Sequence, residues 1–119
     1  ALAHPLSAVA GLHHGLANSL MLPHVIDFNL ESATKRYAAV GTALAGHRAG
    51  DDESRARHCQ EAVVNLIDAI GLPTRLRDCG VEEAHFEKMV PQALADACAP
   101  GNPRLLTEEA AWQLYQEAY

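Results

Sequence analysis

Imidazole side chains concentrate near the start of this 119-residue chain, where they could bind a metal ion or move protons. Four of the seven histidines fall within the first thirty residues, and neither Lys nor Arg occurs in that stretch. These four are His4, His13, His14 and His24. Neutral imidazole is the commonest protein ligand for transition metals, and its pKa also suits proton transfer near neutral pH. A mostly apolar segment that carries four imidazoles therefore indicates the wall of a chemical site.

His14 is the first candidate for a metal ligand. It precedes Gly15 at the predicted start of a helix, where the small neighbour leaves room for a ligand to approach. The alternative for His14 is a histidine that is simply hydrogen-bonded within the protein, because a short pattern stays a hypothesis until its structural context is met.

All the segments that carry and support these residues are predicted to be helices. Alanine is abundant, β-branched residues are few, and no segment alternates apolar and polar residues over the length of a strand. The first three predicted helices cover residues 1–10, which end at Gly11, then 14–29, with a bend or break at Pro23, and then 32–45, which end at Gly46. After a polar loop over 46–52, a fourth helix starts at Asp51 or Asp52 and ends at Gly71. A fifth covers 82–97 with a kink at Pro91, and Thr107 caps the last helix.

Apolar spacing predicts the inner face of the later helices. The residues expected to face inward are Ala33, Tyr37, Val40 and Leu44, then Ala56, Cys59, Val63, Leu66, Ile67 and Ile70, then Phe86, Met89, Leu94 and Cys98, and finally Ala111, Leu114, Tyr115 and Ala118.

Composition narrows the class of protein. A formal net charge of −6 without clustered Lys and Arg argues against a nucleic-acid partner. No apolar run approaches the ~20 residues that span a bilayer, and no secretory signal pattern is present, so we expect no membrane contact and a cytoplasmic protein. Three widely spaced cysteines argue against a disulfide framework. The apolar pattern of a helix is already present at Ala1, and no capping residue precedes it. We therefore expect that this end of the chain is a cut end.

Several short sequence motifs follow one another in the same order as in a known protein family. They are Ala3-His4-Pro5-Leu6, Leu12-His13-His14-Gly15-Leu16-Ala17-Asn18, Leu22-Pro23-His24-Val25, Phe28-Asn29, and Asn102-Pro103-Arg104 after Cys98. The chain thereby resembles the C-terminal helical domain of the iron-containing (group III, metal-dependent) alcohol dehydrogenases, whose text reads roughly AHxLG and PHGxANAxLLPxVxxFN. The resemblance implies one all-α domain over residues 1–119, similar to the C-terminal half of the dehydroquinate synthase-like fold. It also implies that the family's N-terminal α/β cofactor domain is absent from this chain.

The same resemblance implies roles for three residues. His14 matches the last of the family's four metal ligands, and the other three fall outside this chain. The family usually has Pro where His13 stands, but Gly15 and the residues after it keep the register that favours His14. His4 matches a histidine near the nicotinamide and the substrate that is assigned to proton relay or orientation. Cys98 matches a cysteine of the substrate pocket wall, with a buried apolar role as the alternative, and His24 is expected to be structural.

The implied activity is interconversion of an alcohol and an aldehyde by hydride transfer with NAD(P), assisted by Fe²⁺ or Zn²⁺. We expect this chain alone to hold no cofactor tightly and to be inactive, because one ligand of four cannot retain a metal ion. The expected partners are the missing cofactor domain, a small alcohol or aldehyde, and further copies of the chain through Leu2, Leu6, Leu12 and Leu16. The alternatives are a helical module with only a structural or interaction role and a relative of the glycerol dehydrogenase type.

Overall fold

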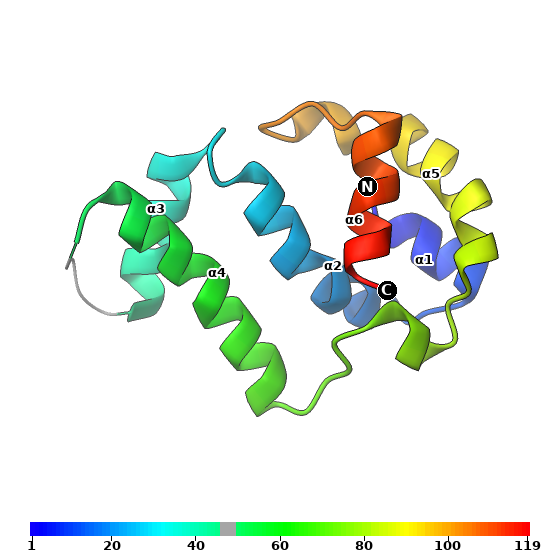
Figure 1. The fold of residues 1–119 in the computed structure, drawn as a ribbon, viewed down its shortest axis with the longest axis horizontal. Helices are drawn as coiled ribbons and strands as arrows, with labels where there is room; N and C mark the ends of the chain where they lie inside the picture. The colour runs from blue at the N-terminus through cyan, green and yellow to red at the C-terminus, as the bar shows by residue number, and fades with distance from the viewer. Residues whose placement is uncertain (46–49) are drawn as a thin grey trace.

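The structure is a computed structural model that describes residues 1–45 and 50–119. The predicted stop at Gly46 and most of the predicted loop over 46–52 lie outside the described residues. In the described ranges the chain forms α-helices joined by 3₁₀ turns, without a β-strand, which confirms the predicted all-α class (Figure 1). The α-helices are α1 (Ala3–Ala10), α2 (His14–Asn29), α3 (Thr34–Ala45), α4 (Asp52–Ala69), α5 (Phe86–Ala95) and α6 (Glu108–Glu117), and the 3₁₀ turns are η1 (Leu76–Cys79), η2 (Glu83–His85) and η3 (Ala99–Gly101).

Helix boundaries follow the predicted stop and cap residues closely. Gly11 ends α1 with φ of 70°, a left-handed conformation that glycine adopts without steric cost. Asp51 accepts a hydrogen bond from the Ser54 amide to cap α4, and Thr107 does the same for α6. α2 runs as one helix through Pro23 and is not divided there.

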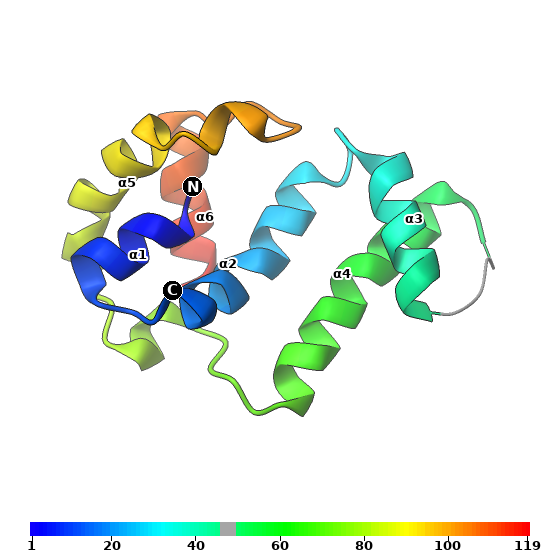
Figure 2. The same ribbon diagram turned by 180° about the vertical axis from the view of Figure 1, so that it is seen from behind.

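The main hydrophobic core lies between α1, α2, α5 and α6, with η1 closing one end. Figures 1 and 2 show these four helices gathered around the two chain termini, while α3 and α4 form a pair on the other side of α2. Phe86 and Tyr115 stack at the centre of this core with ring centroids 5.5 Å apart. All four predicted inward residues of the last helix are buried.

α3 and α4 pack so closely that one residue type is required at the crossing. A β-carbon built on Gly41 of α3 would lie 1.9 Å from the carbonyl oxygen of Arg55 in α4. Only a glycine fits here, because the neighbouring atom belongs to the backbone and cannot rotate away.

Some predicted inner faces are wrong. Val40 and Leu44 of α3 and Leu66 of α4 are about half exposed, as is Ile70, which follows α4. The apolar spacing identified one face of each of these helices, but few other residues of the chain pack against that face. Cys98 is also exposed and lies beyond the end of α5, because that helix stops at Ala95.

Four leucines near the start of the chain were predicted to be partly uncovered and to support self-association, but three of them are part of the core. Leu2, Leu6 and Leu12 are 6%, 0% and 8% exposed, and Leu16 is half-buried. Leu2, Leu6 and Leu12 belong to the core that contains residues of α1, α2, α5 and α6, so these three residues give no support to the predicted self-association. Within the described ranges, no helix combines the length and the apolar composition needed to cross a membrane.

Candidate functional site

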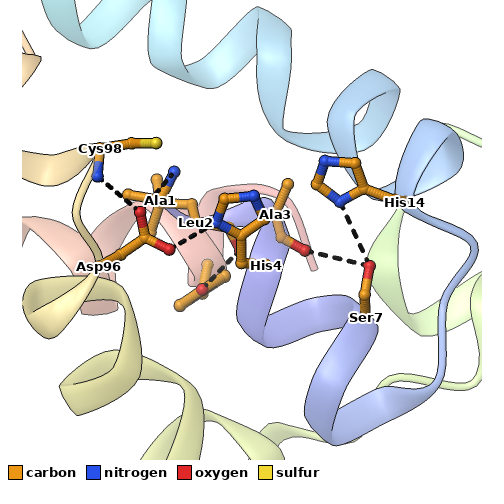
Figure 3. A network of polar contacts seen from close by, with 9 residues as sticks. Ala1, Leu2, Ala3, His4, Ser7, His14, Asp96 and Cys98 are labelled. Carbon is orange, nitrogen blue, oxygen red and sulfur yellow. Dashed lines mark hydrogen bonds and ion pairs between the residues drawn. The ribbon is translucent and has the colours of Figure 1, made fainter.

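His4 and Asp96 form the central contact of the candidate site, although they are 92 residues apart in the sequence. His4 lies in the first turn of α1, and Asp96 directly follows α5. Nδ1 of His4 is 2.5 Å from Oδ2 of Asp96, while the His4 side chain remains half exposed (Figure 3). Such a short contact between an imidazole and a carboxylate is a charge-assisted hydrogen bond.

The Asp96 carboxylate is held on its second oxygen as well. Oδ1 accepts a hydrogen bond of 2.8 Å from the backbone amide of Cys98. The hydrogen bonds from His4 and from the Cys98 amide lower the pKa of Asp96 to about 2. Asp96 is therefore an ionised acceptor at neutral pH.

His14 stands next to His4 at the start of α2. The two imidazole rings stack with centroids 5.0 Å apart and an angle of 14° between their planes. Nδ1 of His14 is 3.5 Å from the hydroxyl oxygen of Ser7, which lies one turn along α1 from His4. Figure 3 shows the order across the site as Cys98, Asp96, His4 and His14.

The position of His4 depends on a buried tyrosine. The Tyr115 hydroxyl in α6 donates a hydrogen bond of 2.8 Å to the carbonyl oxygen of Leu2, which directly precedes α1. Burial raises the pKa of the Tyr115 phenol well above its ordinary value, so the hydroxyl stays protonated and can donate. α6 thereby fixes the start of α1 two residues before His4.

A pair of asparagines ties the loop after Cys98 to the end of α2. Asn29, which is buried, and Asn102 exchange two side-chain hydrogen bonds of 2.8 Å each. Arg104 donates to the carbonyl oxygen of Phe28 and places its guanidinium 4.2 Å from the centre of the Phe28 ring. These contacts tie the loop that contains Asn102 and Arg104 to the end of α2.

Cys98 lies at the edge of a small cavity near this site. The cavity has a volume of about 90 Å³, and Cys98 lines it together with Leu2, Val25, Phe28 and Asn102 among others. The lining is mostly apolar, with an amide at one side. A cavity of this size holds a few non-hydrogen atoms.

The other two early histidines are placed differently. His13 precedes α2 and is exposed. His24 is half-buried in α2, where it lines a separate cavity of about 290 Å³ with Gln60, Val64 and other residues of α2 and α4. Burial lowers the pKa of His24, which favours its neutral form.

One cluster in the described ranges has the composition of a metal site. Possible ligand atoms of His4, Asp96 and Cys98 lie within 4.8 Å of one another, and His14 is not part of this set. The sequence indicated His4 and Cys98 as site residues but did not indicate Asp96. The available signal was an aspartate at the end of a predicted helix two residues before Cys98, which by itself does not identify a partner.

Comparisons with known proteins agree with this architecture. The family model described as "Fe-containing alcohol dehydrogenase family, C-terminal" matches residues 1–119. Lactaldehyde reductase of Escherichia coli (strain K12) is 35% identical over 99% of this chain, and 1,3-propanediol dehydrogenase of Citrobacter freundii is 33% identical over the whole chain. A solved structure of 1,3-propanediol oxidoreductase is 32% identical and superposes with a TM-score of 0.94 over 99% of the chain.

This chain belongs to the iron-containing alcohol dehydrogenase family and corresponds to its C-terminal region. The family match confirms the resemblance indicated by the sequence motifs. The chain spans about 31% of the length of each of these three relatives.

Proposed function

We propose that this chain supplies the helical wall of an alcohol dehydrogenase site that interconverts a small alcohol and an aldehyde with a divalent metal ion and NAD(P). The observation that carries the proposal is the stacked pair of His4 and His14 on an exposed surface. Each ring has Nδ1 engaged by a neighbouring side chain, and in the described ranges no hydrogen bond reaches either Nε2. Two imidazoles with unengaged nitrogens side by side favour this proposal over a module with only a structural role.

His14 and its neighbour Ser7 are suited to an iron or zinc ion bound by the His14 imidazole. A ligating histidine usually has its second ring nitrogen oriented by an oxygen, and the Ser7 hydroxyl lies 3.5 Å from Nδ1 of His14. Nε2 is then the donor atom available to the metal. His14 would supply one ligand of the set, and the other ligands would come from outside this chain.

When bound, a divalent metal ion would polarise the oxygen of the alcohol or aldehyde, and NAD(P) would exchange a hydride with the carbon that bears this oxygen. This chain's own residues then have separate tasks. His14 would hold the ion, and His4 would move the hydroxyl proton, because its ring stacks on that of His14 and its Nδ1 is fixed by Asp96. Cys98 forms part of the wall that limits the size of the substrate.

The wider assembly is part of the proposal. The two curated relatives are about three times as long as this chain, and they are a lactaldehyde reductase and a 1,3-propanediol dehydrogenase. We infer a small alcohol or aldehyde as substrate and an α/β cofactor-binding domain as the partner that completes the metal and nicotinamide sites. The sequence contains no glycine-rich motif of the kind that binds a dinucleotide. NAD(P) would therefore be held mainly by the α/β cofactor-binding domain.

The test uses three alanine variants in the complete enzyme, with His58→Ala on the exposed face of α4 as the matched control. His14→Ala should lose both bound metal and turnover. His4→Ala should keep the metal while turnover falls. Cys98→Ala should keep both and change mainly the relative rates for alcohols of different size. Retained metal in the His14 variant together with lost metal in the His4 variant would refute these assignments.

A further inference from the structure

We propose that Asp96 is a positioning residue that keeps the proton of neutral His4 on Nδ1 and thereby leaves Nε2 as a proton acceptor. The tautomer of His4 is a property of this chain and can be tested without any activity. Only the consequence for turnover rests on the proposed function of His4.

The geometry around Asp96 leaves little freedom for any other arrangement. Oδ2 lies 2.5 Å from Nδ1 of His4, while Oδ1 accepts from the Cys98 amide at 2.8 Å. An ionised carboxylate can only accept hydrogen bonds, so Nδ1 must be the atom that donates. The low pKa of Asp96 is consistent with an ionised carboxylate across the working range of the protein.

The consequence for the opposite ring nitrogen follows from the chemistry of imidazole. A neutral ring carries one proton, and when Nδ1 holds it, Nε2 presents a lone pair. An imidazole without partners in water favours the opposite form, with the proton on Nε2. Asp96 therefore has to reverse the intrinsic preference of His4, and the hydrogen-bonded aspartate of a catalytic triad fixes its histidine in the same way.

The Cys98 amide makes this arrangement unusually easy to test. In Asp96→Asn, the backbone N–H of Cys98 still requires an oxygen opposite it, because an N–H cannot accept from the new amide group. The Asn NH₂ group must then occupy the place of Oδ2, where it donates to Nδ1 of His4. Nδ1 becomes an acceptor and the proton moves to Nε2, so one substitution of nearly identical shape should reverse the tautomer.

The experiment is ¹⁵N NMR of the histidine side chains in this chain, at a pH high enough that the shifts no longer change with pH. His4→Gln identifies the His4 signals by their disappearance. Asp68→Asn, on the exposed end of α4, is the matched control for removal of one carboxylate charge, and His13 provides an exposed internal reference.

In the wild-type chain we expect the His4 proton predominantly on Nδ1, whereas His13 shows the ordinary preference for Nε2. In Asp96→Asn the His4 pattern should reverse, and in Asp68→Asn it should be unchanged. Asp96→Ala, which removes the acceptor without supplying a donor, should return His4 to the ordinary preference. A wild-type His4 with its proton on Nε2 overturns the proposal without any variant, and so does an unchanged pattern in a folded Asp96→Asn chain.

The catalytic consequence is measured in the complete enzyme. If Nε2 of His4 accepts the proton released by the alcohol, Asp96→Asn should lower kcat by about a hundredfold while changing KM much less, because a general base contributes ~10²–10⁴-fold. A reversed tautomer with unchanged kcat would refute the proton-relay role of His4 and would leave the positioning by Asp96 established. An unreversed tautomer would refute the positioning itself, whatever the effect on kcat.

Discussion

Replacing Tyr115 by Phe removes the hydroxyl that fixes the start of α1 and leaves the rest of the side chain unchanged. The ring keeps its place in the core and its stacking on Phe86, so no cavity forms. The carbonyl of Leu2 loses one of two partners, since the residue before a helix also offers its carbonyl to the first turn. The expected cost is therefore that of one net hydrogen bond, about 1 kcal/mol. Truncating Phe86 to Ala should cost much more, ~3–5 kcal/mol, because it removes a buried ring.

Urea unfolding followed by circular dichroism measures this change. With a slope of about 2 kcal/mol per molar, Tyr115→Phe should lower the midpoint by about 0.5 M at an unchanged slope. Tyr37→Phe on α3, remote from α1, is the matched control and should stay within about 0.5 kcal/mol of the wild type. An unchanged midpoint for Tyr115→Phe would show that the hydroxyl does not hold α1. A loss as large as that of Phe86→Ala would show that more than one hydrogen bond depends on it.

Three further outcomes are expected. Gly41→Ala should destabilise the chain by ~1–3 kcal/mol in urea unfolding, because its β-carbon would meet the Arg55 carbonyl, while Gly101→Ala, with open space around it, should have no comparable effect. Asn102→Ala should lower stability by ~1–3 kcal/mol by leaving the buried Asn29 amide unpaired, and the double alanine variant should cost less than the sum of the single variants. Because burial lowers the pKa of His24 in the folded state, the unfolded chain binds more protons as pH falls, so stability should decline below the ordinary histidine pKa of ~6.5 and should decline less in His24→Gln.

The boundaries of the helices could be predicted because local residues determine them. Gly11 and Thr107 mark a helix end and a helix start through φ and side-chain capping, which need no knowledge of distant partners. Burial was less predictable. Leu66 lies on an apolar stripe and is 59% exposed, whereas Leu6 is fully buried, since cover depends on which helices pack together.

The site was predictable only in part for a related reason. His4 and His14 stand close together in the sequence within recognisable words, so their proximity could be expected. Asp96 meets His4 only because α5 packs against α1 and ends beside its first turn. A hydrogen bond across 92 residues leaves no local signal in either segment.

The position of iron in crystals of the complete enzyme, located by anomalous diffraction at the iron absorption edge, tests the role of His14 as the metal ligand. We expect one strong peak at coordinating distance from Nε2 of His14, with the Ser7 hydroxyl still beside Nδ1 and with the hydrogen bond between His4 and Asp96 intact. A peak bound instead by the cluster of His4, Asp96 and Cys98 would contradict the assignment of His14 as the metal ligand and of His4 as the proton-relay group.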